Sequence, residues 1–403
     1  MDPLDILTDL ENVVPFFQPI FSADEQRVFG YEVLGRYESE GQTISLGSFF
    51  QDEQIPDEYK VEVDQLLLRK ALDKALTTNE DVSFFFNRSA GILMHEHGEP
   101  LLNELLEYEK KGINLKRIVL EISEDNYPGD LDQFDHLLRY YRTYGIKIAI
   151  EKMGSDSSYL DRISQLEPDI LKVNLRALRS ETKGNAFNDV LYSLSLLARK
   201  IGAVLLFENI EMEYQLQFAW KNGGRYYQGF YLSHPNSELV DRDLLKDHLK
   251  AKFHDFITYE KRKLEKFYLT AEEFQAKVLE IVQKAKKASY EELFELLIKE
   301  MDQIAFRMYI CDEDGFQKSP NSFKHSNGWV TQNEYIGKNW SWRPYFLENI
   351  IRMRNERKGI LSDLYCDIET GETIRTFSFP LIESGYLFID ITYQYLFEHE
   401  ELL

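Results

Sequence analysis

Residues 29–36 read FGYEVLGR, a short apolar run that carries Glu32 and Arg36 near its end. Six further runs rich in β-branched and aromatic residues follow before residue 235. They end on or near the polar side chains Asn87, Glu121, Glu151, Lys172, Glu208 and Gln228. With FFQPIF at residues 16–21 as an opening strand, the runs number eight. Parallel strands that each deliver a polar group at the carboxyl end form the mouth of a (β/α)₈ barrel, so the sequence predicts an α/β barrel with its site at that mouth.

The polar groups at the ends of these runs are carboxylates, amides, a lysine and an arginine. Any single one means little, because strands often end where a polar loop begins. As a set they offer the oxygen ligands that Mg²⁺ or Mn²⁺ selects, next to cationic groups suited to an anion. Amphipathic helical stretches separate the runs, as in YKVEVDQLLLRKALDKAL at residues 59–76. The pattern therefore predicts a metal-assisted phosphate site on a βα barrel.

Composition limits the remaining classes of function. A chain of 403 residues is expected to form two or three domains. Its formal charge of −22 argues against binding to nucleic-acid polymers or anionic membranes, which would require basic patches. No signal peptide and no apolar run long enough to span a bilayer are apparent, and Cys311 and Cys366 do not make a disulfide framework. These features predict a soluble cytoplasmic protein.

The character of the chain changes after Pro235. Residues 238–300 are highly charged and have a helical period. Their apolar stripe consists of Leu245, Leu249, Phe253, Phe256, Leu264 and Phe267. We expect a long linker helix whose stripe buries against either the following domain or a second copy of the chain, which would make a homodimer.

The last hundred residues predict an antiparallel sheet with helices, because alternating apolar runs are joined by turn signals such as Asp314-Gly315 and Thr370-Gly371. The expected division is a barrel at 1–237, a helical linker at 238–300 and an α+β sensor module at 301–403. A set of polar and aromatic residues in the module either lines a small-molecule pocket or forms a packed core with an ion pair. The packed core is favoured, since nothing identifies a ligand. The set is Trp340, Trp342, Arg343, Tyr345, Asp363 and Asp390.

The order of motifs over residues 10–235 resembles the EAL domain. The matching motifs are Gln18-Pro19-Ile20, Glu32-Val33-Leu34-x-Arg36, Asn87, Glu121-x-x-Glu124, Glu151-Lys152, Lys172-x-Asn174, Glu208-x-x-Glu211 and Gln228-Gly229-Phe230. That family comprises cyclic di-GMP phosphodiesterases and their non-catalytic relatives on a modified (β/α)₈ barrel. WSWRPYFLENI at 340–350 and DLYCDIETGE at 363–372 resemble the PAS-like C-terminal domain of YkuI-type bacterial proteins.

The resemblance implies a role for each site residue. The first divalent ion would be held by Glu32, Asn87, Glu121 and Glu151. Lys172 would orient the attacking water, Glu208 would hold a second ion or act as the base, and Glu124 would brace a loop. The groups that would contact the nucleotide are Gln18, Leu34, Arg36, Glu211 and Gln228.

Two departures from the family pattern bear on activity. Active members carry Asp-Asp where this chain has Glu151-Lys152, so an ammonium replaces a carboxylate that helps to hold the second ion. Asn174 replaces an aspartate and removes a further negative charge. We therefore expect one bound ion rather than two, Mg²⁺ or Mn²⁺, with Ca²⁺ as an inhibitory or structural alternative.

Three functions remain open on this sequence. The first is a cyclic di-GMP receptor whose hydrolysis is weak or absent, coupled to a C-terminal sensor domain. The second is a working phosphodiesterase that produces pGpG and is regulated by the C-terminal domain. The third, an interaction module without the nucleotide, is disfavoured because the groups that would grip it remain.

Overall fold

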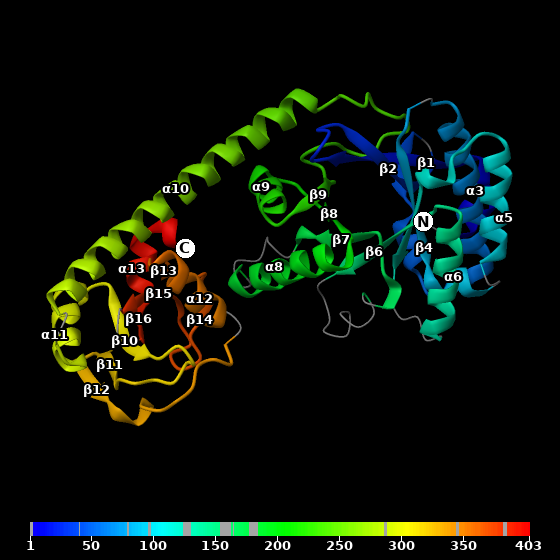
Figure 1. Ribbon diagram of the computed structural model, residues 1–403. Helices are drawn as coiled ribbons and strands as arrows, with labels where there is room; N and C mark the ends of the chain where they lie inside the picture. Colours follow the sequence, from blue (N-terminus) through cyan, green and yellow to red (C-terminus); the bar gives the residue numbers. More distant parts are fainter. Residues whose placement is uncertain are drawn as a thin grey trace. The chain divides into compact units, whose positions relative to one another are not determined.

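The computed structural model describes residues 3–39, 41–78, 80–95, 98–123, 130–153, 163, 165–176, 184–285, 288–343, 346–381 and 385–403. The chain divides into two compact units, residues 1–254 and 255–403. The boundaries predicted near residues 237 and 300 stay predictions. Figure 1 gives the order of the elements along the chain. No helix in these ranges combines the length and the apolar character needed to cross a membrane.

The first unit contains a closed barrel. Its sheet runs in the order β1-β9-β8-β7-β6-β5-β4-β2-β3, and β1 also pairs with β2, which closes the ring. The strands are β1 (Val13–Ser22), β2 (Val28–Ser39), β4 (Ser83–Ser89), β5 (Ile118–Ser123), β6 (Lys147–Met153), β7 (Ile170–Asn174), β8 (Val204–Glu208) and β9 (Gly224–Tyr227), with the short β3 (Gln42–Ser45) beside β2. Seven of the eight predicted runs form strands of this barrel, and the last, YYQGFYL at residues 226–232, begins in β9 and continues beyond it. The eight-stranded barrel confirms the predicted fold.

The first strand runs against the others. β1 pairs antiparallel with both β2 and β9, whereas the pairs from β2 through β9 are parallel. A connection as short as residues 23–27 can join only antiparallel strands, because a parallel pair needs a crossover of a dozen or more residues. This reversal is what distinguishes the barrel from an ordinary (β/α)₈ barrel.

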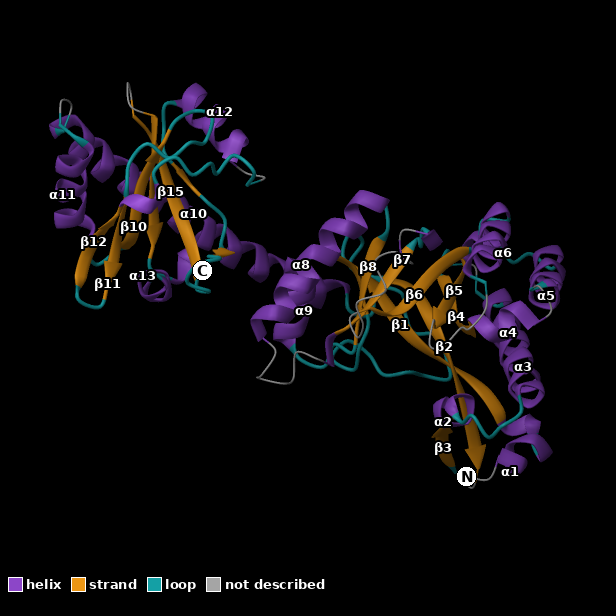
Figure 2. Ribbon diagram, turned by 90° about the horizontal axis from the view of Figure 1, so that it is seen from below, coloured by secondary structure: helices purple, strands orange, loops and turns teal. Residues whose placement is uncertain are grey.

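Helices lie outside the strands, as Figure 2 shows. The longer ones are α3 (Asp57–Leu76), α5 (Glu99–Lys110), α6 (Leu131–Thr143), α8 (Gly184–Ile201) and α9 (Glu213–Lys221); the shorter ones are α1 (Pro3–Thr8), α2 (Gly47–Gln51) and α4 (Ala90–His95). Inside the barrel, alternate residues of the strands form one apolar layer. It consists of Ile20, Phe85, Val119, Ala149, Ile170, Leu206 and Tyr226.

Helix α10 (Lys246–Lys284) contributes to both units. Near its start Leu249 and Phe253 are buried, and the Phe253 ring lies 5.8 Å from that of Tyr227. Near its end Phe274 and Val278 belong to the apolar core of the second unit. Of the predicted stripe, Phe267 packs against this core as expected, whereas Leu249 and Phe253 bury in the first unit and Leu264 stays exposed.

The second unit is an antiparallel sheet with helices, as predicted. Its strands follow the order β12-β11-β10-β16-β15-β13, and β14 pairs with β15. Their bounds are β10 (Ala305–Cys311), β11 (Asn321–His325), β12 (Gly328–Gln332), β13 (Ile360–Leu361), β14 (Tyr365–Cys366), β15 (Thr373–Leu381) and β16 (Gly385–Ile391). The helices are α11 (Tyr290–Met301), α12 (Phe346–Glu356) and α13 (Tyr393–Glu398).

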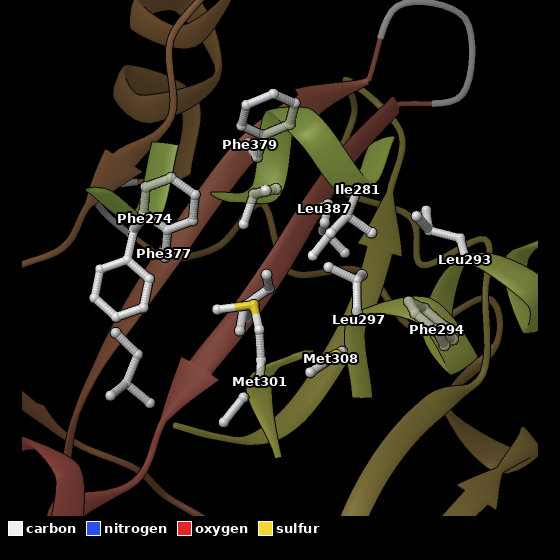
Figure 3. Close-up of a cluster of buried hydrophobic side chains, with 14 of the residues drawn as sticks. Phe274, Ile281, Leu293, Phe294, Leu297, Met301, Met308, Phe377, Phe379 and Leu387 are labelled. Carbon is white, nitrogen blue, oxygen red and sulfur yellow. The ribbon is translucent and has the colours of Figure 1, made fainter. Parts of the chain in front are cut away.

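One face of this sheet packs against α10 and α11. Figure 3 shows Phe274 and Ile281 from α10, and Leu297 from α11, against Met308, Phe377 and Leu387 from the strands. Leu297 is fully buried there, whereas its neighbour Leu296 is 37 % exposed. The core of the second unit therefore depends on helical residues that precede the sheet in the chain.

This packing makes a prediction with a matched control. Leu297→Ala should lower the free energy of unfolding of the second unit by about 2–5 kcal/mol, because it removes buried methyl groups and leaves a cavity. Leu296→Ala should change it by less than about 1 kcal/mol, because that side chain already contacts water. Urea unfolding followed by circular dichroism measures both. Equal effects of the two substitutions would contradict this account of the core.

Candidate functional site

Seven of the predicted site residues at the barrel mouth lie two positions from a member of the apolar layer, whereas Glu32 follows Gly30 on β2. The pairs are Ile20 and Gln18, Phe85 and Asn87, Val119 and Glu121, Ala149 and Glu151, Ile170 and Lys172, Leu206 and Glu208, and Tyr226 and Gln228. Because side chains alternate along a strand, each polar group projects into the barrel directly beyond an apolar one. On the antiparallel β1 the step runs backward, so Gln18 lies at the same level and pairs in register with Glu32.

Lys172 lies at the centre of this polar layer and is fully buried. Its Nζ donates to Glu121 Oε2 at 2.8 Å and to Glu32 Oε2 at 3.2 Å. It also donates to Glu151 Oε1 at 3.4 Å, and Glu208 Oε2 lies 3.6 Å away. A lysine has three N–H donors, so these hydrogen bonds use all of them. Lys172 could therefore orient a water only if another cation took over one of the carboxylates.

The carboxylate of Glu32 is held by two amides from neighbouring parts of the barrel. Asn87 Nδ2 donates to its Oε1 at 2.9 Å, and Gln228 Nε2 donates to its Oε2 at 2.6 Å. Burial by itself would raise the pKa of Glu32. The charge of Lys172 and the hydrogen bonds from Asn87 and Gln228 outweigh burial, so the pKa is lowered and Glu32 is ionised.

Burial disfavours the ionised forms of Glu121 and Glu208. Burial raises the pKa of Glu121 well above its ordinary value, and the charges of Glu32 and Glu151 raise it further. Burial also raises the pKa of Glu208. For Lys172, burial acts to lower the pKa, but the four surrounding carboxylates raise it well above its ordinary value. The lysine is therefore permanently charged, yet it cannot neutralise four acids alone.

A divalent cation fits this cluster. Glu32, Glu121 and Glu151 each offer an oxygen, and these oxygens lie within 4.8 Å of one another. Glu121 Oε1 is buried and has no hydrogen-bond partner among the described residues. An unpaired carboxylate oxygen inside a group of acids is a natural ligand for Mg²⁺, Mn²⁺ or Ca²⁺. The structure thus brings together the predicted ligands Glu32, Asn87, Glu121 and Glu151.

Arg36 lies further along β2 on the same side as Leu34, and both are partly exposed. Arg36 Nη1 donates to Gly35 O at 2.9 Å and to Ser45 Oγ at 3.4 Å, and the guanidinium lies 5.8 Å from the centre of the Phe16 ring. Burial lowers its pKa and the charge of Glu32 opposes this, but the group stays charged. Arg36 is placed to contact an anion entering at this edge.

Other predicted residues occupy different surroundings. Asn174 turns its Oδ1 to the backbone N–H of Arg176 at 2.9 Å, so it caps a turn at the end of β7. Glu211 is partly buried beyond β8. Glu124 and the side chain of Lys152 lie outside the described residues.

Sequence reasoning missed one group that positions the site. Gln215 is fully buried in α9, and its Oε1 accepts from the backbone N–H of Glu211 at 2.7 Å and of Met212 at 3.0 Å. A glutamine in the first helical turn after an apolar strand is the signal that could have found it. Gly229 belongs to the motif Gln228-Gly229-Phe230 that the sequence singled out: its φ is +155°, and a Cβ there would lie 2.1 Å from Ile210 O. No other residue lets the chain turn this closely after Gln228.

The raised pKa of Glu121 makes a prediction about stability and pH. A carboxyl with a raised folded-state pKa costs stability above that pKa, and the cost disappears as the pH falls below its ordinary value of 4.5. Glu121→Gln should therefore raise the metal-free stability at neutral pH by about 1 kcal/mol, and the gain should vanish near pH 4. It should also abolish stabilisation by Ca²⁺. Thermal melts with EDTA or CaCl₂ at several pH values measure both effects.

The control for this variant is Glu107→Gln, which changes a solvent-exposed acid of the same unit. It should retain the calcium-dependent shift of the melting temperature. A calcium shift of parental size in Glu121→Gln would show that this carboxylate is not a ligand.

Comparison with known proteins covers the whole chain. Residues 4–235 match the EAL domain, and residues 239–403 match the EAL-domain associated signalling protein domain. An uncharacterised EAL-domain protein of Bacillus subtilis, YkuI, is 53 % identical over 406 residues, covering all of both chains. Its crystal structure, described as a complex with substrate c-di-GMP and calcium, superposes with a TM-score of 0.95 over the full length of both chains.

More distant relatives match the first unit. The probable cyclic di-GMP phosphodiesterase PdeD of Escherichia coli is 23 % identical over 227 residues, which is 55 % of this chain and 41 % of that protein. The structure of the PaMucR phosphodiesterase in complex with c-di-GMP has a TM-score of 0.52 at 22 % identity, covers 59 % of this chain and 98 % of the other, and shows the fold alone. On the full-length match, the closed barrel and the two domains, the chain belongs to the EAL-domain family, with the two-domain arrangement of YkuI.

Proposed function

We propose that this protein is a cytoplasmic receptor that binds cyclic di-GMP and one divalent cation at the barrel mouth and hydrolyses the nucleotide weakly or not at all. The observation that carries binding is the group of three acids whose oxygens lie within 4.8 Å of one another, with Arg36 beyond it on β2. The relative YkuI, at 53 % identity, has been crystallised with c-di-GMP and calcium. That complex supports the same ligands here.

Different residues would bind the cation and the nucleotide. Glu32, Glu121 and Glu151, with the amide oxygen of Asn87, would hold the cation. When bound, the cation supplies positive charge that polarises a phosphate oxygen and a water. Arg36 would pair with a phosphate oxygen, and Gln18, Leu34, Glu211 and Gln228 would contact the rest of the nucleotide. Release of one carboxylate to the cation would free a donor on Lys172 for that water.

The weakness of catalysis rests on the two departures in the sequence. Lys152 follows Glu151 directly in β6, and Asn174 stands where the family pattern has an aspartate. Both changes remove negative charge that a second divalent ion would require. In support, the Asn174 side chain is engaged with the backbone of its own turn.

A working phosphodiesterase regulated by the second unit is the other candidate. The observation in its favour is that Lys172 remains surrounded by Glu32, Glu121, Glu151 and Glu208, so the parts for one ion and an activated water are present. Calorimetric titration of cyclic di-GMP with EDTA, Mg²⁺ or Ca²⁺, beside chromatography for pGpG, separates the candidates. Binding heat without product supports the receptor, and steady product supports the enzyme.

Restoring the missing charge makes the sharpest prediction. Lys152→Asp should raise pGpG formation with Mn²⁺ by at least about tenfold, and Lys152→Asp combined with Asn174→Asp should raise it further, because a second cation gains ligands. Lys152→Gln is the matched control: it removes the ammonium without adding a charged ligand, and should give a smaller gain. If Lys152→Asp makes no more pGpG than the parent, position 152 does not limit activity.

We also propose that the protein is a homodimer with α10 at its seam. Phe253, which the sequence pattern places on the helix stripe, is buried against Tyr227 and so is not free for a partner. Ile257, Leu264 and Tyr268 recur at helical spacing and are exposed. These three residues form the surface that supports the proposal.

Leu264→Glu should shift the protein from dimer to monomer in light scattering after gel filtration, because it places a charge on this surface. Leu347→Glu, at an equally exposed leucine of α12, should leave the mass unchanged. A dimer that persists in Leu264→Glu would move the contact elsewhere.

A further inference from the structure

Strand β2 extends beyond the ring of parallel strands. It pairs with β4 only from Gly30 to Val33, although it continues to Ser39. Its outer part, which carries Arg36, pairs antiparallel with the start of β1 on one side and with β3 on the other. Arg36 therefore lies on a three-stranded antiparallel extension of the barrel.

The inner face of this extension continues the polar layer of the barrel mouth. Glu32 pairs in register with Gln18 inside the barrel. Because side chains alternate along a strand, the next residues on the same face are Leu34 and Arg36 on β2 and Phe16 on β1. The guanidinium of Arg36 thus belongs to the face that a ligand at the mouth would contact.

The outer face of the extension packs on an apolar cluster of its own. Figure 2 shows α1, α2 and β3 at the same end of the unit, and these elements enclose the cluster together with α3. We call it the outer cluster, and its buried members include Ile6, Tyr37, Leu46, Phe49 and Leu67. None of them belongs to the apolar layer inside the barrel. The segment of β2 that carries Arg36 is therefore supported by a separate core.

Gly35 sets the distance between β2 and the outer cluster. A Cβ at this position would lie 2.7 Å from Leu67 Cδ1 and 3.2 Å from Leu46 Cδ1. The backbone N–H of Leu46 also donates to Gly35 O at 3.1 Å. A side chain here would have to displace Leu67 or the strand itself, so the close contact depends on the glycine.

Three contacts hold Arg36 on the inner face. Nη1 donates to Gly35 O at 2.9 Å and to Ser45 Oγ at 3.4 Å, and the guanidinium lies 5.8 Å from the centre of the Phe16 ring. Among the described residues, its other N–H groups have no hydrogen-bond partner, so they can donate to an anion. A guanidinium that is already held in place loses less conformational entropy when it binds.

We propose that Phe16 and Gly35 are positioning residues for Arg36. The Phe16 ring and the close approach of β2 to the outer cluster hold the guanidinium at the barrel mouth and so set the affinity for the nucleotide. The affinity for the cation depends on the three acids and not on this extension. The inference rests on the proposed function, because the position of Arg36 matters only if a phosphate binds there.

Calorimetric titration of the full-length protein with cyclic di-GMP in excess CaCl₂ tests the role of the ring. Phe16→Leu should weaken nucleotide binding by about threefold to tenfold, because a cation–π contact is lost. Phe16→Tyr should keep the parental affinity, because it keeps the ring. In thermal melts without nucleotide, Phe16→Leu should show the parental rise of the melting temperature on addition of CaCl₂.

A double-mutant cycle shows whether Phe16 acts through Arg36. Arg36→Gln should weaken nucleotide binding by at least about tenfold, because a charge-assisted hydrogen bond is lost. Phe16→Leu added to that variant should cause less than about a twofold further loss, since the two residues act as a unit. A ring that stacked on a base of the nucleotide would instead give the same loss in both backgrounds.

Substitution of the glycine tests the outer cluster. Gly35→Val should weaken nucleotide binding by at least about tenfold, because the new side chain meets Leu67 and moves β2 away from the cluster. Leu67→Ala in the same chain should recover part of the loss by making room. Gly91→Ala in α4 is the control and should bind as the parent does, because its Cβ would lie 3.6 Å from Ser89 Oγ, an ordinary contact. Circular dichroism confirms that each variant is folded.

The inference is overturned if Phe16→Leu keeps the parental affinity, or if it weakens binding equally with and without Arg36→Gln. It is also overturned if a folded Gly35→Val binds the nucleotide as the parent does, or if either variant loses its response to calcium together with the nucleotide. In all these results the parent binds cyclic di-GMP, so the proposed function stands. A parent that does not bind it would refute the proposed function, and the inference with it.

Discussion

The site depends on one buried ammonium. Lys172 lies between four carboxylates from four strands, and its three donors are all engaged. Without that charge, the acids could not be held together inside a barrel, because like charges at this separation repel strongly in a low dielectric. One positive charge does not neutralise four acids, and Glu121 keeps an oxygen without a hydrogen-bond partner in the part of the chain that the structure describes. The repulsion among these carboxylates lowers the stability of the metal-free barrel, and a bound divalent cation would relieve it. Proteins commonly give up some stability in this way to form a functional site.

This arrangement is possible because a well-packed apolar layer lies directly beneath it. Phe85, Val119 and Leu206 are buried directly below the polar layer. Because side chains alternate along a strand, their fixed positions also fix those of Asn87, Glu121 and Glu208, two residues further on. The antiparallel direction of β1 does not disturb the polar layer. Gln18, two residues before the apolar Ile20 in the chain, pairs in register with Glu32 and so lies at the same level.

The sequence predicts much of this fold and site because the relevant signals are local. Apolar runs that end on polar residues give the strands and, with them, Glu32, Lys172 and the other members of the ring. The direction of β1 is not contained in such a run and follows from the length of its connection. The partners of Lys172 also escape prediction, since they depend on how strands distant in the chain come together.

Helix α10 is unbroken over 39 residues, and its two ends take part in the cores of different units. Leu249 and Phe253 complete the barrel, and Phe274 and Val278 complete the sheet. A fragment ending before residue 246 would leave Tyr227 without its covering ring, and one beginning after residue 284 would open the sheet's apolar face to water. Dissecting this protein into separately expressed halves therefore requires both halves to keep their own share of the helix, with the cut within residues 257–262, which are exposed or partly exposed.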